Sequence, residues 1–506
     1  MTKIETTSRD KILAVLLAPL AGAGITLSLA PYNIWPAGIF SCIALLHLLS
    51  TCSPKQALLR GWLFGLGMFG TGVSWVYVSI HVHGHTGVFL AAVLTALFCA
   101  GLALLHSTLA WCYTKYVREL PGGMLAGFPA LWVLFEWLRS WLLTGFPWLY
   151  LGYGHVDTPI AGWAPVIGIY GLSLICALTA SCLYLTWRAR KWINSLSYAA
   201  IITALWLGGS QLQPIGWVAQ ASEEPLSVAI YQPNIPQEKK WDRKWYKPIL
   251  EQYRSAMEPL YGHDIVVWPE SAIPSFFQRS DDFLQPISQQ AARSGTALIT
   301  GIPFREEGSE QYFNSIVALG DGEGAYHKQR LVPFGEYVPF ERQLRGLIAF
   351  FDLPMSSFSA GPPQQQSLST GTYRVAPFIC YEVVYPDLVA ENASAADLLI
   401  TISNDSWFGR SIGPLQHLQM AQMRALENGR YMIRGTNNGI SAIIDHRGKI
   451  TAQSQQFVTT TLRGEVQVML GSTPFSSFGS RPVIIGCAIA LLLMTAMYWA
   501  FWRQEH

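Results

Sequence analysis

The stretch Val375-Ala-Pro-Phe-Ile-Cys-Tyr-Glu382 decides how the polar half of this chain is expected to fold. Its apolar run predicts a buried strand, and the strand ends in a cysteine that is soon followed by a carboxylate. A thiol at the end of a strand, on the edge of a sheet, is a position suited to an attacking nucleophile. The alternative is a buried structural cysteine, because free cysteine is among the most buried residue types.

Three further stretches favour a chemical role: Val267-Trp-Pro-Glu-Ser271, His327-Lys-Gln-Arg-Leu-Val-Pro-Phe-Gly-Glu336 and Ser403-Asn-Asp-Ser-Trp-Phe-Gly409. Around them, strand-like runs alternate with helical periodicity, which predicts an α/β domain whose site lies at one rim of a sheet. The predicted strands are Leu226–Tyr231, Asp264–Trp268, Ala297–Ile302, Ser315–Leu319, Tyr373–Ile379, Leu398–Ser403, Gly439–Asp445 and Thr459–Val468, and the predicted helices are Lys244–Tyr261, Phe283–Arg293 and Leu415–Arg430.

The composition favours a membrane protein over a soluble one. The chain has 506 residues, of which 51% are hydrophobic and 13% charged, and this balance is unusual for a soluble protein. It is too long for one ordinary domain. The formal net charge is only +2, and the sequence has no basic stripe of the kind that nucleic-acid-binding proteins carry, so we expect no nucleic-acid partner.

The first 212 residues predict a series of membrane-spanning helices, because a span needs about 20 mainly apolar residues. The eight candidates are Ile12–Ala30, Ile34–Leu49, Gly61–Ile80, Thr86–Trp111, Met124–Leu143, Ile160–Trp187, Leu196–Ser210 and Pro482–Trp502. We therefore expect a multi-span α-helical membrane domain with seven transmembrane helices over residues 1–212. An α/β domain over residues 213–481 follows, and an eighth transmembrane helix with a short tail covers residues 482–506.

Lysine and arginine residues in the short connections predict the orientation of these helices. Basic residues lie at the N-terminus and in every second connection, and the alternate connections are nearly free of them. The basic positions are Lys3, Arg9, Lys11, Lys55, Arg60, Lys115, Arg118, Arg188, Arg190, Lys191 and Arg503. All of them fall on one side, which should be the cytoplasm. Both termini are then cytoplasmic, and the polar domain is periplasmic or extracellular.

The placement of cysteine and histidine argues against a disulfide or a metal site. Cys380 is the only cysteine of the polar block, so it has no disulfide partner there, and no zinc-type spacing surrounds it. His81, His83 and His85 alternate in an outer loop, but no carboxylate or cysteine lies beside them to complete a metal site. We expect loop histidines without function and no metal or other cofactor.

Two other features leave alternatives open. Glu136 and Arg139 lie three residues apart in the fifth predicted span, where they would form an ion pair near the edge of the bilayer or grip a lipid headgroup. The stretch from Ile348 to Pro363 is too apolar to face bulk water, so we expect it to touch the membrane or to cover the site.

A glutamate, a lysine and a cysteine at strand or loop ends can together carry out nucleophilic catalysis. A free thiol is largely protonated near neutral pH. A carboxylate in a dry pocket can accept that proton, because burial raises its pKa. Attack on a carbonyl then builds an oxyanion, which an ammonium group and backbone N–H donors stabilise. No histidine is adjacent to Cys380 in sequence, although sequence distance does not exclude His327 or His417 as its partner.

These motifs resemble those of the nitrilase superfamily of carbon–nitrogen hydrolases. Trp-Pro-Glu-Ser, the lysine before Leu-Val-Pro-Phe-Gly-Glu, Ile-Cys-Tyr-Glu and Ser-Asn-Asp-Ser-Trp-Phe-Gly stand in the expected order between residues 226 and 470. The resemblance implies an α-β-β-α sandwich with a Glu-Lys-Cys triad. On that match, Glu270 is the general base, Lys328 stabilises the oxyanion and Cys380 is the nucleophile.

The whole chain resembles one branch of that superfamily more closely, the apolipoprotein N-acyltransferases of the bacterial inner membrane. Matches in the membrane half are Ala30-Pro-Tyr32, Gly72-Val-Ser-Trp-Val-Tyr-Val-Ser79 and Thr144-Gly-Phe-Pro-Trp148. The branch implies a periplasmic catalytic domain between the seventh and eighth of eight spans. It also implies ping-pong acyl transfer. A phospholipid, typically phosphatidylethanolamine, acylates the cysteine, and the α-amino group of a diacylglyceryl-modified N-terminal cysteine on an apolipoprotein then takes the chain.

The resemblance also implies roles for residues around the triad. Expected to support the site are Glu336, Tyr381 (through its backbone N–H), Glu382, Asn314 and Asn404, and expected to contact substrate are Trp148, Trp241, Phe358 and Trp407. The alternatives are structural ones. The glutamates could form a loop salt bridge or a structural hydrogen bond, and the tryptophans could be interfacial anchors.

Two other functions remain open from the sequence. A membrane-tethered amidase or nitrilase that hydrolyses a small periplasmic amide would use the same triad, since water and an amine differ only as the second nucleophile. The seven preceding spans and the apolar stretch favour a lipid substrate instead. A transporter that uses the spans as a pore is disfavoured by the sparse intramembrane charge and the intact triad.

Overall fold

The computed structural model describes residues 8–306, 308–309, 311–337 and 357–505. They divide into two compact units. The helical unit contains the residues up to Tyr77, Phe89–Ile215 and the residues from Phe478 onward. The α/β unit contains Gly216–Ser477 and a short segment from the N-terminal half, Val78–Val88.

The α/β unit contains two large β-sheets. The strands of the six-stranded sheet are, in spatial order, β14 (Thr460–Val466), β2 (Leu226–Gln232), β3 (Ile265–Val267), β4 (Ala297–Arg305), β5 (Tyr312–Gly320) and β7 (Ala325–His327). Those of the seven-stranded sheet are β13 (Ile450–Gln453), β12 (Ala442–Ile444), β11 (Met432–Thr436), β10 (Leu398–Ser403), β9 (Tyr373–Ile379), β8 (Leu368–Thr370) and β6 (Gly322–Glu323). A separate two-stranded sheet pairs β1 (Val218–Gln220) with β15 (Met469–Gly471).

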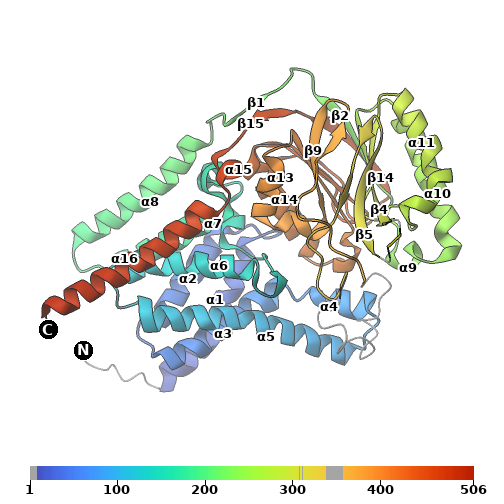
Figure 1. Ribbon diagram of the computed structural model, residues 1–506. Helices are drawn as coiled ribbons and strands as arrows, with labels where there is room; N and C mark the ends of the chain where they lie inside the picture. The colour runs from blue at the N-terminus through green and yellow to red at the C-terminus, as the bar shows by residue number, and fades with distance from the viewer. Residues whose placement is uncertain (1–7, 307, 310, 338–356, 506) are drawn as a thin grey trace. The chain divides into compact units, whose positions relative to one another are not determined.

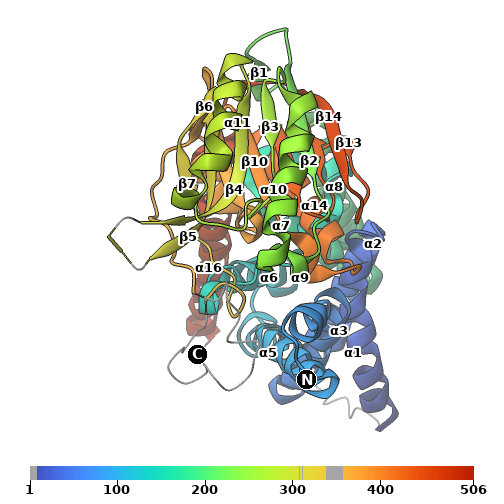
Figure 2. The same ribbon diagram turned by 90° about the vertical axis from the view of Figure 1, so that its right-hand side faces the viewer.

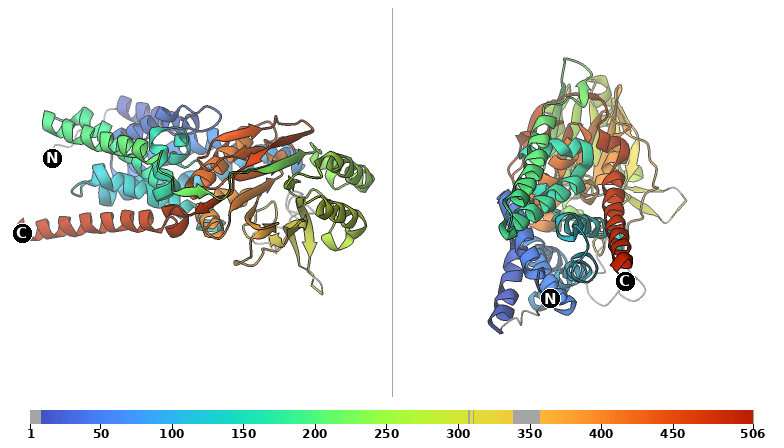
Figure 3. Two further views of the ribbon diagram at one scale, coloured as in Figure 1. Left: turned by 90° about the horizontal axis from the view of Figure 1, so that it is seen from above. Right: turned by 90° about the vertical axis from the view of Figure 1, so that its left-hand side faces the viewer.

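Helices cover the outer faces of the two large sheets. Figure 1 shows α13 (Pro386–Ala393) and α14 (Gly413–Asn428) beside the sheet that contains β9, and α10 (Arg243–Met257) and α11 (Asp281–Arg293) beyond the other sheet. Figure 2 shows α10 and α11 lying across β2, β3 and β4, and the view from above in Figure 3 shows the same layers. The unit is therefore the α-β-β-α sandwich that the resemblance implies.

Two apolar clusters hold these layers together. Along β2, Val228 and Ile230 belong to the cluster between the two sheets, where they are buried with Ile379 and Ile400 of the other sheet. The alternate residues of β2 belong to the cluster beneath α10 and α11, with Tyr253 and other buried side chains. This division follows from the alternation of side chains along a strand, and it explains why strands buried on both faces read as continuous apolar runs.

The parallel pairing of the central strands brings several strand ends to the same edge. Strand β3 pairs in parallel with β2 and β4, and β9 pairs in parallel with β10, which is itself parallel to β11. Strand β3 ends shortly before Glu270, β9 ends immediately before Cys380, and β10 ends immediately before Asn404. The sequence motifs thus lie at carboxyl ends of parallel strands, where α/β folds place their sites.

The helical unit consists of apolar helices. The main ones are α1 (Ser8–Ser28), α2 (Trp35–Leu49), α3 (Pro54–Gly72), α5 (Val88–Cys112), α6 (Phe128–Arg139), α7 (Ala164–Arg188), α8 (Trp192–Leu212) and α16 (Arg481–Glu505). Helix α1 packs against α2 and α3, and α6 packs against α7 and α16. Smaller helical turns connect several of them.

Not every predicted span is a helix long and apolar enough to cross a membrane. Three described helices meet that requirement, Val88–Val117, Pro159–Arg188 and Arg481–Ala500, and a pair bent by 60°, Pro54–Gly72 with Val76–His83, makes a fourth if it is one span. Two further apolar helices, Leu13–Ser28 and Trp35–Leu49, are shorter. The helical membrane region is thus supported, and the predicted number of eight spans is not confirmed.

Two predicted spans differ in form from a continuous helix. In the third, Gly61–Ile80, helix α3 ends at Gly72, and Val73 has a non-helical φ of −134°. In the fifth, Met124–Leu143, a π-helical turn over Gly123–Gly127 leads into helix α6, which ends at Arg139, and Leu143 has a left-handed φ of +52°. Hydropathy measures only how apolar a segment is, so it does not reveal such breaks.

Candidate active site

The three side chains of the expected triad follow strand ends of the α/β unit and are all buried. Glu270 follows β3, Lys328 follows β7 and Cys380 follows β9. Their exposed fractions are 6%, 1% and 8%, respectively. Lys328 Nζ lies 3.6 Å from Glu270 Oε1. Burial of two opposite charges and a thiol together is unusual outside functional sites.

The carboxyl end of β10 connects the cysteine sulfur to the glutamate. Ser403 Oγ lies 3.3 Å from Cys380 Sγ, and the backbone N–H of the next residue, Asn404, donates to Glu270 Oε2 at 2.8 Å. The sulfur and the carboxylate therefore contact two consecutive residues at the end of β10. Cys380 itself has a φ of +52°, a conformation that is uncommon for residues other than glycine and that occurs often at functional turns.

The charges around the sulfur favour a protonated thiol and a charged lysine at rest. Burial and the charge of Glu270 raise the pKa of Cys380 above its usual value, whereas Lys328 and the Ser403 hydroxyl act in the opposite direction. Burial would lower the pKa of Lys328, but Glu336 and Glu270 outweigh it and raise that pKa. Such a thiol needs a base in position before it can attack, and such a lysine remains a cation throughout.

Asn314 and Glu336 join the base to the lysine. The side-chain amide of Asn314, on β5, donates to Glu270 Oε1 at 2.7 Å and to Glu336 Oε1 at 3.0 Å. Lys328 Nζ donates to the same oxygen of Glu336 at 2.8 Å. The other oxygen of Glu336 accepts from the backbone N–H of Val332 at 2.8 Å. Both residues were predicted to support the site, and the structure brings both into contact with the triad.

Glu382 ties the lysine loop to the cysteine strand. Its Oε1 accepts from Tyr326 Oη at 2.9 Å and from the backbone N–H groups of Gln329 at 2.7 Å and Arg330 at 3.2 Å. Its Oε2 accepts from the backbone N–H of Ile379 at 2.8 Å. Burial raises the pKa of Glu382 to about 7, although the backbone N–H donors and Lys328 favour the carboxylate. Glu382 thus bridges residues that follow Lys328 and the residue that precedes Cys380.

A buried lysine that the sequence analysis did not single out also touches the site. Lys240 is 2% exposed, and its Nζ donates to the backbone carbonyl oxygen of Glu270 at 2.8 Å. Burial lowers the pKa of Lys240 to about 8, although the negative charge of Glu270 acts to raise it. Trp241, the next residue, is 36% exposed. Its predicted contact with lipid stays a prediction.

The other predicted substrate-contact residues have protein partners. Phe358 donates its backbone N–H to the Glu336 carbonyl oxygen at 3.0 Å and packs its ring against Tyr312. Trp148 belongs to the helical unit, where it is 1% exposed and packs against neighbouring aromatic rings. Trp407 is half-buried beside the site loop. Most of the apolar stretch expected to cover the site, residues 348–356, lies outside the described residues.

Both histidines that the sequence left open have partners in the structure. His417 Nε2 lies 3.1 Å from the backbone carbonyl oxygen of Cys380, and its Nδ1 lies 3.3 Å from Asp405. His327 bonds to the Ser315 hydroxyl at 2.7 Å. The cluster that contains His417 escaped the sequence analysis, because its members are far apart in the chain. Its visible signals were Asp405, inside a quoted motif, and His417 itself.

Of the three alternating histidines, His81 and His83 have hydrogen-bond partners, whereas His85 is exposed. His83 Nε2 lies 2.8 Å from the backbone carbonyl oxygen of Ser406, and its ring packs against Trp407 at 5.2 Å. Ser79 donates to the Trp407 carbonyl oxygen at 2.7 Å. This segment therefore braces the loop that follows β10, a structural role that the sequence analysis missed. Among the described residues, no group of three or more metal-ligating side chains has metal-site geometry.

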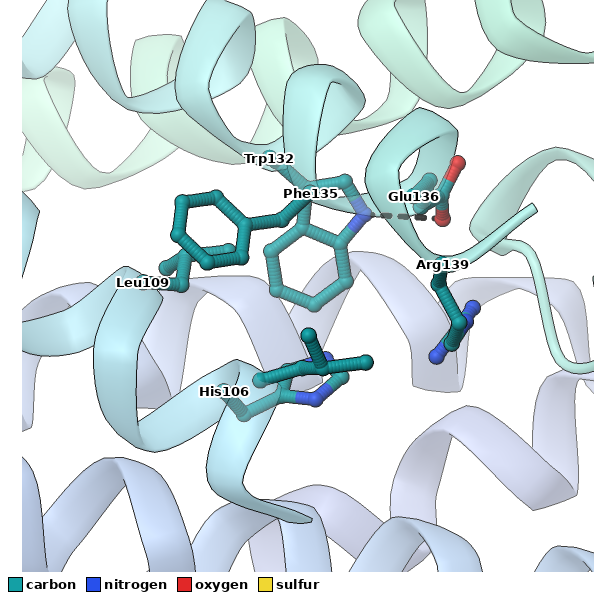
Figure 4. A pocket seen from close by; sticks show the side chains of 7 residues that line it. His106, Leu109, Trp132, Phe135, Glu136 and Arg139 are labelled. Atoms are coloured by element: carbon teal, nitrogen blue, oxygen red, sulfur yellow. Dashed lines mark hydrogen bonds between the residues drawn. The ribbon is translucent and has the colours of Figure 1, made fainter. Parts of the chain in front are cut away.

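Glu136 and Arg139 line a small cavity of the helical unit, shown in Figure 4. Glu136 accepts hydrogen bonds from the Trp132 indole and the Leu151 backbone N–H, both at 2.9 Å. Arg139 lies over the ring of Tyr150. The described residues contain no contact within 4 Å between the two charges, so each has partners other than the expected ion pair.

Comparison with known proteins addresses both halves of the chain. A family model described as the apolipoprotein N-acyltransferase N-terminal domain matches residues 21–182, and one described as carbon-nitrogen hydrolase matches residues 227–475. An apolipoprotein N-acyltransferase of Pseudomonas syringae pv. tomato is 47% identical over 482 residues, which is 94% of this chain and 95% of the relative. This chain belongs to the apolipoprotein N-acyltransferase family.

Other members of the family are similarly close. The apolipoprotein N-acyltransferase of Pseudomonas aeruginosa PAO1 is 47% identical over 94% of each chain. That of Vibrio parahaemolyticus is 41% identical over 94% of this chain and 96% of its own. The resemblance drawn from the motifs is thus confirmed. A solved nitrilase-superfamily protein of Saccharomyces cerevisiae, Nit3, covers 49% of this chain and 91% of its own at 19% identity and a TM-score of 0.38, too distant to inform residue roles.

Proposed function

We propose that this chain transfers a fatty acyl chain from a phospholipid to the α-amino group of the diacylglyceryl-modified N-terminal cysteine of apolipoproteins. Membership in the apolipoprotein N-acyltransferase family makes it an acyltransferase that acts in lipoprotein N-acylation. The observation that supports the proposed chemistry is the buried Glu270–Lys328 pair, whose charges both act on the Cys380 thiol. Hydrolysis of a small amide is not favoured.

The first half-reaction makes a thioester. Glu270 takes the thiol proton, and Cys380 Sγ attacks the sn-1 ester carbonyl carbon of the phospholipid. Lys328 and the backbone N–H of Tyr381 stabilise the oxyanion. Collapse of the tetrahedral intermediate breaks the ester C–O bond, and Glu270 returns its proton to the leaving alkoxide. The lysophospholipid then departs.

The second half-reaction makes an amide. The α-amino group of the apolipoprotein cysteine attacks the thioester carbonyl, and Glu270 takes a proton from the nitrogen. The C–S bond breaks with its electron pair on sulfur, and the thiolate recovers a proton from Glu270. Lys328 serves the oxyanion in both half-reactions, because the carbonyl carbon occupies the same place beside Sγ.

The donor and the location are further parts of the proposal. The donor is a phospholipid such as phosphatidylethanolamine, and no cofactor takes part. The chain crosses the bacterial inner membrane eight times with both termini in the cytoplasm and the catalytic unit in the periplasm. The distribution of lysine and arginine supports this arrangement. Two membrane-anchored substrates then meet a site on the outer side of the membrane.

Intact mass spectrometry tests the acyl-enzyme. The purified protein is incubated with a phospholipid of defined acyl chains, beside Cys380→Ala and the control Cys487→Ala, which removes another free cysteine. We expect a fatty-acyl mass increment on the wild type and on Cys487→Ala, absent from Cys380→Ala and released by neutral hydroxylamine. An increment on Cys380→Ala, or none on folded wild type, would count against the thioester.

A further inference from the structure

A hydroxyl group lies between the sulfur of Cys380 and a buried carboxylate. Ser403, the last residue of β10, is fully buried. Its Oγ lies 3.3 Å from Cys380 Sγ and 2.6 Å from Asp405 Oδ1. The hydroxyl has one proton and two neighbours within hydrogen-bond distance, so it can donate to only one of them at a time. The roles assigned above to the triad do not use this group.

Arg434 keeps that carboxylate ionised. Its NH2 group donates to Asp405 Oδ2 at 2.8 Å, and both side chains are fully buried. Burial would raise the pKa of Asp405, but the charge of Arg434 outweighs it and holds that pKa well below its usual value. A carboxylate only accepts hydrogen bonds. The Ser403 proton therefore points to Asp405 at rest, and the Ser403 oxygen is left to accept the thiol hydrogen of Cys380.

His417 attaches the same cluster to the backbone of the nucleophile. Its Nε2 lies 3.1 Å from the Cys380 carbonyl oxygen, a contact that requires a proton on Nε2. The neutral ring then accepts at Nδ1 from Arg434, which lies 3.1 Å away. Burial and Arg434 lower the pKa of His417, in agreement with a neutral ring. Backbone and sulfur of Cys380 are thus both connected to the pair Asp405–Arg434.

We propose that Ser403 is a positioning residue for Cys380 and that its hydroxyl changes from acceptor to donor when the thiolate forms. At rest, the hydroxyl donates to Asp405 and accepts the S–H hydrogen. When the thiol proton passes to Glu270, the hydroxyl turns and donates to the thiolate. The inference rests on the proposed function in one respect, which is that Cys380 is the nucleophile.

The same exchange acts in the second half-reaction. When the amine attacks the thioester, the C–S bond breaks and its electron pair moves onto Sγ. The Ser403 hydroxyl then donates to the departing thiolate, which makes sulfur a better leaving group. A hydrogen bond to a charged group is worth more than one between neutral groups. Ser403 therefore favours the charged form of Cys380 in both directions.

Removal of Ser403 changes a hydrogen bond and no charge. The charged and titratable groups that act on the Cys380 sulfur are Glu270, Lys328 and Asp405. Glu336 contacts Lys328, and both Arg434 and His417 contact Asp405. All of these groups remain in Ser403→Ala, so a shift in thiol titration reports the lost hydroxyl.

The test measures alkylation of Cys380 by iodoacetamide against pH, in the full chain in detergent. Because all eight cysteines are free, the reaction is scored on the peptide that contains Cys380. The variants are Ser403→Ala, Ser403→Thr, which keeps the hydroxyl, and the control Thr401→Val. Thr401 is two residues earlier on the same strand, and its buried hydroxyl has no partner among the described residues.

We expect Ser403→Ala to move the alkylation midpoint up by about one pH unit, which is tenfold less thiolate at a given pH. Ser403→Thr and Thr401→Val should keep the wild-type midpoint. An unchanged midpoint in Ser403→Ala, or an equal shift in either of the other variants, would overturn the proposal. Alkylation needs no phospholipid, so failure of wild type to form the acyl-enzyme would refute the proposed function and leave this measurement valid.

Discussion

Each carboxylate near Cys380 has a different set of partners. Lys328 lies within hydrogen-bond distance of Glu336, at 2.8 Å, but 3.6 Å from Glu270. Glu270 is held mainly by an amide and a backbone N–H. Glu336 therefore makes the closest contact with the ammonium, and Glu270 is the carboxylate that we propose as the base. Because their surroundings differ, one carboxylate can act as the base while the other holds the lysine in place.

Glu270→Gln should prevent formation of the acyl-enzyme. Glutamine has nearly the same shape but cannot take the thiol proton, so we expect the thioester to form at least ~100-fold more slowly. The measurement is the initial rate of acyl mass gain from phospholipid. Glu323→Gln, which changes an exposed glutamate of β6, is the control and should react as the wild type does. A normal rate in Glu270→Gln would remove it from the role of base.

Lys328→Ala should slow the chemistry and leave lipid binding nearly intact. Loss of one oxyanion donor costs roughly 3–4 kcal/mol of barrier, or about 100- to 1,000-fold in rate. The measurement is acylation rate against phospholipid concentration, which separates the maximal rate from the half-saturating concentration. A change in the half-saturating concentration alone would contradict the oxyanion role.

At the scale of elements, Glu382 connects a loop to a strand, and its protonation should appear in the stability of the unit. Its pKa is raised from 4.5 to about 7 in the folded protein. The folded state therefore holds the proton more tightly than the unfolded state. This contribution to stability is fully present below about pH 4.5 and is lost as the pH rises to about 7.

In Glu382→Gln, the melting temperature should consequently depend less on pH than it does in the wild type. Its melting temperature is expected to be lower than that of the wild type at acidic pH, because an amide cannot accept all the N–H donors around it. The difference should narrow as the pH rises from about 4.5 to 7. Thermal melts of both proteins over this range check it. A constant difference over the range would show that Glu382 does not titrate there.

Asp405→Asn should destabilise the α/β unit strongly, because three elements meet at this residue. Asp405 lies in a short turn after β10, Arg434 on β11 and His417 on α14. Loss of the carboxylate leaves Arg434 buried without its counter-charge, at a cost of about 3–5 kcal/mol. Glu251→Gln, which breaks an exposed pair with Arg254, should cost less than about 1 kcal/mol. Denaturant unfolding measures the loss of stability in both variants, and equal losses would contradict the expected role of Asp405.

At the scale of the whole molecule, the charge pattern predicts that Ser222 and Lys55 lie on opposite sides of the membrane. Both are exposed, so cysteine at either position is within reach of a reagent. In intact spheroplasts, a membrane-impermeant maleimide should label Ser222→Cys and spare Lys55→Cys until the cells are lysed. Wild type measures the labelling of native cysteines. Labelling of Lys55→Cys before lysis would contradict the predicted orientation.

The sequence was enough to predict the family and the sandwich, whereas Asn314, Glu336 and Glu382 came from the family resemblance and their roles stay predictions. It could do so because these properties are local. A buried strand can be recognised as an apolar run, and its end as the point where that run meets polar residues. The motifs can be recognised because they follow one another in the order typical of the family. The apolar segments indicated a helical membrane region for the same reason.

Which distant residues meet at the sulfur depends on how strands pair and helices pack. Ser403 contacts Cys380 because β10 pairs in parallel with β9. Arg434 and His417 reach Asp405 from elements that follow it in the chain. The breaks in two predicted spans were likewise not predictable from the sequence, because packing overrides an apolar pattern. Such contacts depend on strand pairing, register and helix packing. These are three-dimensional properties, so the local pattern of residues along one chain does not reveal them.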